Sequence, residues 1–214
     1  MAMDGKIPEL VTEKDLGGII HVHTIYSDGR NTIEELAEEV IKMGYRYIGI
    51  ADHSKSAYYA GGLKEDDIRR QHEEIDKLNE KYKERGFRIY KGIESDILPD
   101  GSLDYEDNIL ESFDFVIASV HSHFNMSKDE MTKRIIKALS HPKTTILGHP
   151  TGRLLLGRDG YQVDLDEVLM AAKEMGKALE LNANPMRLDL DWRWLRKAKN
   201  LGVKIAVDPD AHNI

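Results

Sequence analysis

The chain alternates short apolar runs with longer amphipathic segments. The runs, such as Tyr47-Ile48-Gly49-Ile50 and Phe115-Val116-Ile117-Ala118, are continuously apolar, as is typical of strands that helices cover on both faces. On this basis we predict seven strands, at residues 18–23, 46–51, 87–93, 114–119, 145–148, 178–182 and 204–207.

Between these runs, apolar residues recur with the helical period. Helices are predicted at residues 32–43, 65–84, 127–139, 164–175 and 191–200, with a short one near 105–111. Several of them end at a glycine just before the next strand, as in Met175-Gly176-Lys177 and Leu201-Gly202-Val203. Helices that feed strands in this way form parallel βαβ units, so we expect an α/β fold, a closed or nearly closed βα barrel.

Length and composition indicate an ordinary globular protein. The 214 residues suit one domain, and the hydrophobic content of 41% excludes a disordered chain. We interpret residues 1–15 as an N-terminal extension and residues 16–214 as the single folded domain. The first five residues resemble a start-site remnant and are left out of the fold prediction. No apolar run approaches membrane-spanning length and no signal peptide is recognisable, so a cytoplasmic protein without a membrane partner is expected.

The chain contains no cysteine, which excludes disulfides and thiolate metal sites. Any metal must therefore be bound by nitrogen and oxygen. The formal net charge of −8 argues against a protein that grips long nucleic acid with its whole surface. It leaves room for a local cationic site.

Metal-ligand residue types gather at the predicted strand ends. In parallel α/β folds the functional site lies at the carboxyl ends of the strands, and six of the seven predicted strands end in such a residue. A single histidine there would more often be structural, but six strands together indicate a metal site. The candidate ligands are His21, His23, Asp28, His53, Glu94, His121, His149, Asp210 and His212.

The first two candidates end the first strand, where alternation should direct His21 and His23 to one face. Nine ligands are too many for one ion and suit three. Glu94 is the natural bridge, because a carboxylate can join two ions and a neutral imidazole cannot. Three divalent ions with three carboxylates leave about three positive charges, which would select phosphate or another oxyanion. Mixed ligands of this kind suit zinc, manganese and iron alike.

Further polar residues lie near the same rim. Arg153 is the strongest candidate for contacting substrate, because a guanidinium fork suits phosphate oxygens. His72 and His141 are expected at the surface. The other residues considered for substrate contact, each of which could equally be a loop or capping residue, are Lys55, His123, Asn182 and Asn184.

Seven ordered motifs resemble the PHP (polymerase and histidinol phosphatase) domain family. They are His21-x-His23-Thr24, Ser27-Asp28-Gly29, Asp52-His53-Ser54, Gly92-Ile93-Glu94, Val120-His121-Ser122, Gly148-His149-Pro150 and Asp210-Ala211-His212. The resemblance runs from Leu16 to His212 and implies a distorted seven-stranded βα barrel with a trinuclear metal centre. It assigns one ion to His21, His23, Glu94 and Asp210, a second to Glu94, His121 and His149, and a third to Asp28, His53 and His212.

Longer phrases at residues 52–56, 97–104 and 148–153 are most similar to the PHP domain attached to bacterial family X DNA polymerases. The resemblance therefore implies a metal-dependent phosphoesterase that processes DNA 3′ ends or acts as a 3′–5′ exonuclease. Glu94, Asp210 and Arg153 would be its catalytic residues. The chain departs from this subgroup at Gly18, where aspartate is usual, and at His123, where arginine is expected, and the usual closing helix after His212 is missing.

Three other functions stay open at this point. A small-molecule phosphatase of the histidinol-phosphate kind is the main alternative. A catalytically silent structural module is also conceivable, although the complete ligand set argues against it. Hydrolysis of a C–N bond, as in amidohydrolase barrels, is the third alternative. A strand-end lysine that could bridge two metal ions when carbamylated would favour it, and the sequence has none. The sequence makes no prediction of an oligomeric state.

Overall fold

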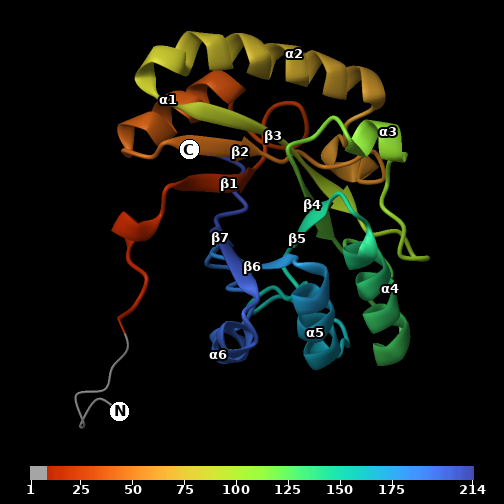
Figure 1. Ribbon diagram of the computed structural model, residues 1–214. Coiled ribbons are helices and arrows are strands. Elements are labelled where there is room, and N and C mark those ends of the chain that lie inside the picture. The colour runs from red at the N-terminus through yellow and green to blue at the C-terminus, as the bar shows by residue number, and fades with distance from the viewer. Residues whose placement is uncertain (1–8) are drawn as a thin grey trace.

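The computed structural model describes residues 9–214, and within them the polypeptide forms a nearly closed barrel (Figure 1). All neighbouring strands are parallel and follow the order of the sequence, which confirms the predicted α/β fold. The strands are β1 (Gly18–Val22), β2 (Tyr47–Ile50), β3 (Arg88–Asp96), β4 (Phe115–Ser119), β5 (Thr144–Leu147), β6 (Ala178–Asn182) and β7 (Lys204–Asp208).

Helices connect the strands as predicted. They are α1 (Ile33–Lys42), α2 (Glu65–Tyr82), α3 (Asp107–Leu110), α4 (Lys128–Ser140), α5 (Leu165–Met175) and α6 (Trp192–Leu201). Three 3-10 helices are η2 (Glu13–Asp15), η3 (Tyr58–Ala60) and η4 (Lys83–Arg85). Of the predicted N-terminal extension, residues 1–8 lie outside the described residues. No helix follows β7 in the described chain, and none of the described helices is long and apolar enough to cross a membrane.

Local signals in the sequence begin these helices where expected. At the start of α1 the Thr32 hydroxyl accepts from the Glu35 N–H at 3.2 Å, and the Glu35 carboxylate accepts from the Thr32 N–H at 2.9 Å. This reciprocal pair satisfies two backbone donors that a helix leaves unpaired at its first turn. Ser127 and Glu130 make the same arrangement at the start of α4. The helix boundaries therefore follow from short-range chemistry.

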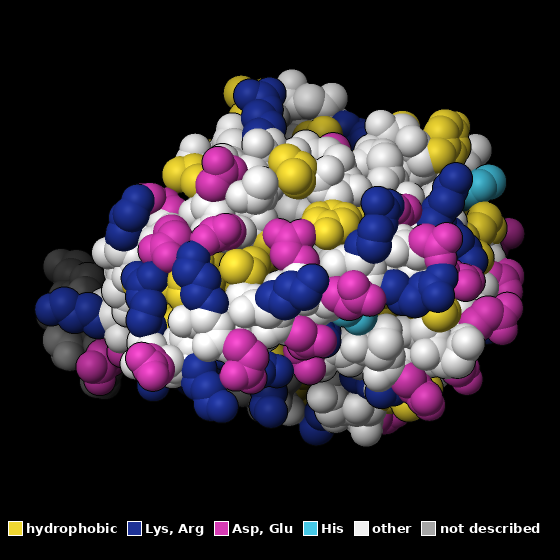
Figure 2. All heavy atoms as spheres, turned by 90° about the horizontal axis from the view of Figure 1, so that it is seen from above, with side chains coloured by type: hydrophobic (Ala, Val, Ile, Leu, Met, Phe, Trp, Pro, Cys, Tyr) yellow, Lys and Arg dark blue, Asp and Glu magenta, His cyan; other side chains and the backbone are white. Residues whose placement is uncertain are grey.

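Outer helices α1 and α2 show a solvated face (Figure 2). Basic and acidic side chains are intermixed there, and Lys81 pairs with Glu34 across the two helices. Beneath them lies a narrow apolar stripe of α2, whose buried residues include Ile68, Ile75 and Tyr82. This face of the two helices is accordingly exposed to solvent, as the charged residues of the predicted helices indicate.

Phe115, the first residue of β4, packs against residues of neighbouring strands. Its ring packs with buried Ala51, Ile117 and Ile146. Gly92 is needed beside it, because a Cβ there would lie 2.2 Å from Cζ of Phe115. A Cβ on Gly49 would likewise meet the Phe115 ring, at 2.8 Å, so both glycines leave room for this ring between β2, β3 and β4.

The barrel closes at those carboxyl ends. Val22 and Ala211 form a parallel bridge between the end of β1 and the segment after β7. The His23 N–H donates to the Ala211 carbonyl at 2.9 Å, and the Ala211 N–H donates to the His21 carbonyl at 3.2 Å. Closure therefore brings the first and the last ligand-bearing segments of the chain side by side.

Candidate metal centre

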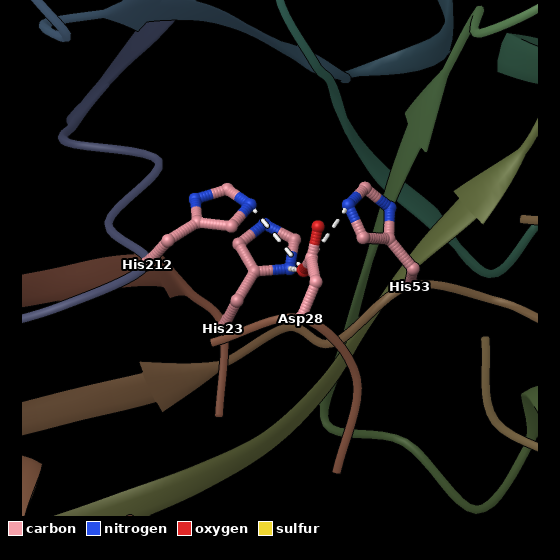
Figure 3. A group of neighbouring side chains, drawn as sticks. All are labelled: His23, Asp28, His53 and His212. Carbon is pink, nitrogen blue, oxygen red and sulfur yellow. Dashed lines mark ion pairs between the residues drawn. The ribbon is translucent and has the colours of Figure 1, made fainter. Parts of the chain in front are cut away.

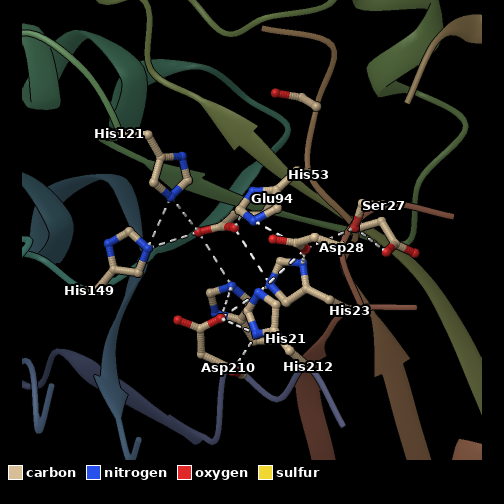
Figure 4. A network of polar contacts seen from close by, with 12 residues as sticks. His21, His23, Ser27, Asp28, His53, Glu94, His121, His149, Asp210 and His212 are labelled. Carbon is tan, nitrogen blue, oxygen red and sulfur yellow. Dashed lines mark hydrogen bonds and ion pairs between the residues drawn. The ribbon is translucent and has the colours of Figure 1, made fainter. Parts of the chain in front are cut away.

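The structure brings all nine predicted ligands together at the mouth of the barrel (Figure 4). They come from six different strand ends. His21 belongs to β1 and Glu94 to β3, and the others follow β1, β2, β4, β5 and β7. Convergence of residues that are up to 191 positions apart along the chain thus depends on the barrel topology.

Glu94 lies at the centre of the group. Its two carboxylate oxygens lie within 4 Å of imidazole nitrogens from five histidines: His149 (2.9 Å), His53 (3.0 Å), His121 (3.2 Å), His21 (3.3 Å) and His23 (3.7 Å). Burial opposes the charged form, but the positive charges of the nearby histidines outweigh it and hold the pKa of Glu94 well below its usual range. Glu94 is therefore an anion placed where a bridging ligand would lie.

Around Glu94 the ligands form neighbouring groups. The donor atoms of His21, His23 and Asp210 all lie within 4.8 Å of one another. A second group joins His53, Glu94 and His121 within the same limit, and Nε2 of His149 lies 3.3 Å from Nε2 of His121. Members of both groups contact the Glu94 carboxylate: His21, His121 and His149 each lie within 3.3 Å of its Oε1. This arrangement suits two neighbouring ions that Glu94 would bridge.

The third group surrounds Asp28 (Figure 3). Its Oδ1 lies 3.4 Å from Nε2 of His212, 3.7 Å from Nε2 of His53 and 3.8 Å from Nδ1 of His23. The side chains of Asp28 and His212 are 37% and 38% exposed, whereas His23 is fully buried. This group is the part of the centre that is open to solvent.

The donor set fits divalent metal ions. Nε2 of His21 and Nδ1 of His23 are buried and lack a hydrogen-bond partner among residues 9–214. An unpaired buried polar atom typically costs about 1–3 kcal/mol, so such atoms call for a partner. Imidazole nitrogens and carboxylate oxygens, without sulfur, suit zinc, manganese and iron. The residues present therefore match the group that the sequence predicts.

Unusual backbone conformations aim several of these side chains. His21, His149 and Asp210 have φ of 57°, 21° and 48°, in the left-handed region that non-glycine residues seldom adopt. The pairing of β1 with β2 also shifts register between Ile19 and Val22. The His21 and His23 rings do lie close, with centroids 5.3 Å apart. The prediction that these two rings lie close together is confirmed, but regular strand alternation is not the cause. The irregular backbone at His21 sets the directions of the two side chains.

A layer of carboxylates behind the ligands was missed from sequence. Asp96 Oδ1 lies 2.6 Å from Nδ1 of His121, and Glu180 contacts Nδ1 of His21. Each contact leaves the Nε2 atom of the ring directed toward Glu94. Burial opposes the charged imidazole, but Glu94 and Asp96 raise the pKa of His121 to about 10. A glutamate in the middle of the apolar run 178–182 was the available signal for Glu180.

Two further residues of this layer belong to β6 and β7. Burial, together with the neighbouring Glu180 carboxylate, raises the pKa of Asp208 well above its usual range. The Asn182 amide donates to Asp210 Oδ2 at 3.0 Å. Asn182 therefore orients a ligand, while Asn184 accepts from the Met186 N–H and shapes the next loop.

Asp52 anchors the loop that carries His23 and Asp28. Its buried carboxylate accepts from the N–H and the hydroxyl of Thr24, each at 2.7 Å, and from the Gln71 amide at 2.7 Å. The Ser27 hydroxyl donates to the same carboxylate. Four donors on one carboxylate hold this loop against the end of β2.

The motif order and the barrel agree with comparison to known proteins. The PHP domain family matches residues 20–184. This chain belongs to the PHP domain family. The family assignment made from the sequence motifs is thereby confirmed, together with the barrel fold.

Relatives and a solved structure support the same assignment. This PHP domain is 46% identical over 206 residues to the DNA polymerase/3′-5′ exonuclease PolX of Bacillus subtilis (strain 168), and the match covers 96% of this chain but 36% of that protein. It is 36% identical over 209 residues to a probable phosphatase of Thermoanaerobacter sp. (strain X514), covering 90% of this chain and 77% of that one. These relatives agree with the expectation of a metal-dependent phosphoester hydrolase.

In fold, the PHP domain resembles histidinol phosphate phosphatase from Lactococcus lactis, solved in complex with Zn, L-histidinol and phosphate. The TM-score is 0.65 at 20% sequence identity, and the match covers 91% of this chain and 86% of that one. At this identity the likeness shows the fold alone.

Arg153 of the PHP domain does not reach the ligands. Its Nε donates to the Arg187 carbonyl at 2.9 Å, Nη1 donates to Asp191 at 2.8 Å, and Nη2 donates to the Leu188 carbonyl. Within residues 9–214 it forms no ion pair with any of the nine predicted ligands. Its donors are occupied because it holds the loop after β6, and that loop carries another arginine.

Arg187 is the arginine that borders the ligand group. Its Nε lies 3.3 Å from Asp210 Oδ2, and its Nη1 is buried without a hydrogen-bond partner in the described part of the chain. Arg187 is not among the residues predicted from the sequence, because it follows no strand directly. Lys55 and His123 lie on exposed loop positions, in the segments after β2 and β4.

The two histidines that were expected at the surface are less exposed than predicted. His72 is half-buried in α2, and its ring packs edge-on against Phe113 at 4.9 Å between centroids. His141 ends α4, and its Nε2 lies 3.1 Å from Asp107 Oδ1. The surface prediction was wrong for His72, since α2 turns this position toward the short α3 region.

Proposed function

We propose that this PHP domain hydrolyses phosphodiester bonds at the 3′ end of single-stranded DNA. The observation that carries the hydrolase chemistry is the convergence of nine nitrogen and oxygen ligands around the buried Glu94 carboxylate. The DNA substrate is supported by the identity of 46% to PolX, which extends over 96% of this chain. The chain spans 36% of PolX, so the activity is proposed for this domain alone.

Three divalent ions fit the ligand groups. One would be held by His21, His23, Glu94 and Asp210, a second by Glu94, His121 and His149, and a third by Asp28, His53 and His212. When bound, such ions polarise phosphoryl oxygens and activate water for hydrolysis. The side chains of the domain supply the remaining functions.

Arg187 is suited to bind the reacting phosphate. Its guanidinium lies next to Asp210 and keeps Nη1 unpaired within residues 9–214. Fixed N–H donors stabilise negative charge that develops on phosphoryl oxygens. Arg153 would act through the Arg187 carbonyl and Leu188 carbonyl that it binds, and so position this loop.

A small-molecule phosphatase is the second candidate. The identity of 36% to a probable phosphatase of Thermoanaerobacter sp. (strain X514), over 90% of this chain, supports it. The net charge of −8 also suits a small anionic substrate in a local cationic pocket better than a long DNA strand.

One comparison separates the two candidates. We would measure kcat/KM of the metal-loaded protein for a 5′-labelled single-stranded oligonucleotide and for a small phosphomonoester, with the same metal and low salt. The proposal expects nucleotide removal from the 3′ end with the higher kcat/KM. Rapid monoester hydrolysis with an intact oligonucleotide would favour the phosphatase, and no hydrolysis of any phosphoester would favour a silent module.

Metal content tests the three-ion assignment separately. Elemental analysis of protein never exposed to chelator should give two to three transition-metal ions per chain, because three ligand groups share the mouth. Asp28→Asn is the matched variant, since it should lose about one ion while the buried groups retain theirs. Less than one equivalent even after metal reconstitution would contradict the assignment.

A further inference from the structure

The segment that follows His53 presents two tyrosines and a lysine to solvent. Tyr58 is 86% exposed and Tyr59 is 65% exposed, and their ring centroids lie 6.0 Å apart at 78°. Lys55 is exposed on the same segment. An adjacent pair of exposed aromatic rings next to a basic residue has the composition of a single-stranded nucleic-acid contact.

The inner side of this segment is fastened to the barrel. The Lys55 N–H donates to the Tyr105 hydroxyl at 3.1 Å, and the Ser56 N–H donates to Asp104 at 2.6 Å. Ala57 and Ala60, on either side of the tyrosines, are buried. The backbone that carries the two rings is therefore held in one shape, so binding requires little further ordering of the main chain.

The segment that carries the tyrosines lies beside the metal centre. Their 3-10 turn η3 begins five residues after His53, and the backbone of Gly61 lies against Ser27, next to Asp28. Partial burial, together with the nearby carboxylates of Asp96, Glu94 and Asp28, raises the pKa of Tyr59 to about 12.

We propose that Tyr58 and Tyr59 form a stacking platform for bases of a single-stranded DNA whose 3′-terminal phosphodiester lies at the metal centre. Lys55 would meet a backbone phosphate beside it. This inference rests on the proposed DNA function and adds the way in which the strand is held. Base stacking tolerates any base, because every base has an aromatic face, so the platform suits an enzyme that shortens strands of any sequence.

The experiment compares two oligonucleotides that differ in one feature. Both are 5′-labelled single strands, and the second carries abasic residues at its last two 3′ positions. The platform predicts that wild-type kcat/KM is about tenfold or more higher for the strand with bases. In the double variant Tyr58→Ala with Tyr59→Ala, this ratio should fall to near one. The double variant to phenylalanine keeps the rings and should keep the ratio.

Tyr90→Ala is the matched control, because Tyr90 is an exposed aromatic in the first half of β3, away from the mouth. It should leave the ratio unchanged. An equal rate on both strands in wild type, or an unchanged ratio in the alanine double variant, would overturn the platform while leaving the DNA function intact. Failure of wild type to cleave the strand with bases would instead overturn the proposed function, and the platform with it.

Discussion

Glu180 holds the Nδ1 edge of His21, and Nε2 of the same ring then lies 3.3 Å from Glu94. The Glu180 carboxylate also accepts from the backbone N–H of His149. Both histidines have positive φ, a conformation that costs about 1–3 kcal/mol each and persists only where the surroundings enforce it. One buried carboxylate on β6 therefore supports two ligands from β1 and β5.

Substitution Glu180→Gln should weaken metal binding without unfolding the protein. The amide keeps the volume but loses the negative charge that orients His21. We expect the metal affinity to fall about 10- to 100-fold, measured by competition with a chromogenic chelator. Glu174→Gln, at an exposed position of α5, is the control and should bind metal like wild type. Equal affinities in both variants would show that Glu180 does not orient the ligand.

Glu94→Gln should reduce phosphoester hydrolysis by about a hundredfold or more. Glu94 contacts five histidines, and the amide cannot supply the negative charge that balances neighbouring ions. Steady-state rates and circular dichroism, measured on the same preparation, separate lost chemistry from lost fold. Near-normal turnover in the folded variant would mean that Glu94 is not the bridge.

Replacement by lysine should have different effects at Arg187 and at Arg153. Arg187→Lys is expected to lower kcat about a hundredfold on an oligonucleotide and on a small phosphodiester alike, because both present the same reacting phosphate. Arg153→Lys should have a smaller effect on kcat and should lower the melting temperature, since it loses the bonds to Asp191 and to the loop carbonyls. The reverse order of effects would restore Arg153 as the phosphate contact.

His72 predicts a pH dependence of stability. Burial, with Lys91 nearby, lowers the pKa of His72 to about 4, against an ordinary value of 6.5. Below pH 6.5 the unfolded chain therefore binds a proton that the folded chain refuses, so stability falls as the pH drops from 6.5 toward 4. Urea midpoints of metal-free protein at pH 7.5 and pH 5 measure this loss. It should be smaller in His72→Leu, and identical losses in both proteins would contradict the assignment.

Much of this protein is determined locally by its sequence. Apolar runs, the Thr32 and Ser127 caps and the glycines after helices predict the seven strands and the six α-helices to within a few residues of their observed bounds, but not the 3-10 helices η2 and η3. The ligands could also be named from the sequence, because a parallel barrel directs all strand ends to one rim. Seven short motifs in a set order were enough to identify the PHP domain family.

Tertiary structure alone decided which polar groups meet. Arg153 and Arg187 look alike in the sequence, but only the fold of the loop after β6 binds one to carbonyls and brings the other to Asp210. Likewise, Glu180 becomes a support for His21 only when β6 and β1 face one barrel interior. Such contacts join positions far apart along the chain, and no local propensity encodes them. Closure of the barrel determines which side chains share that interior.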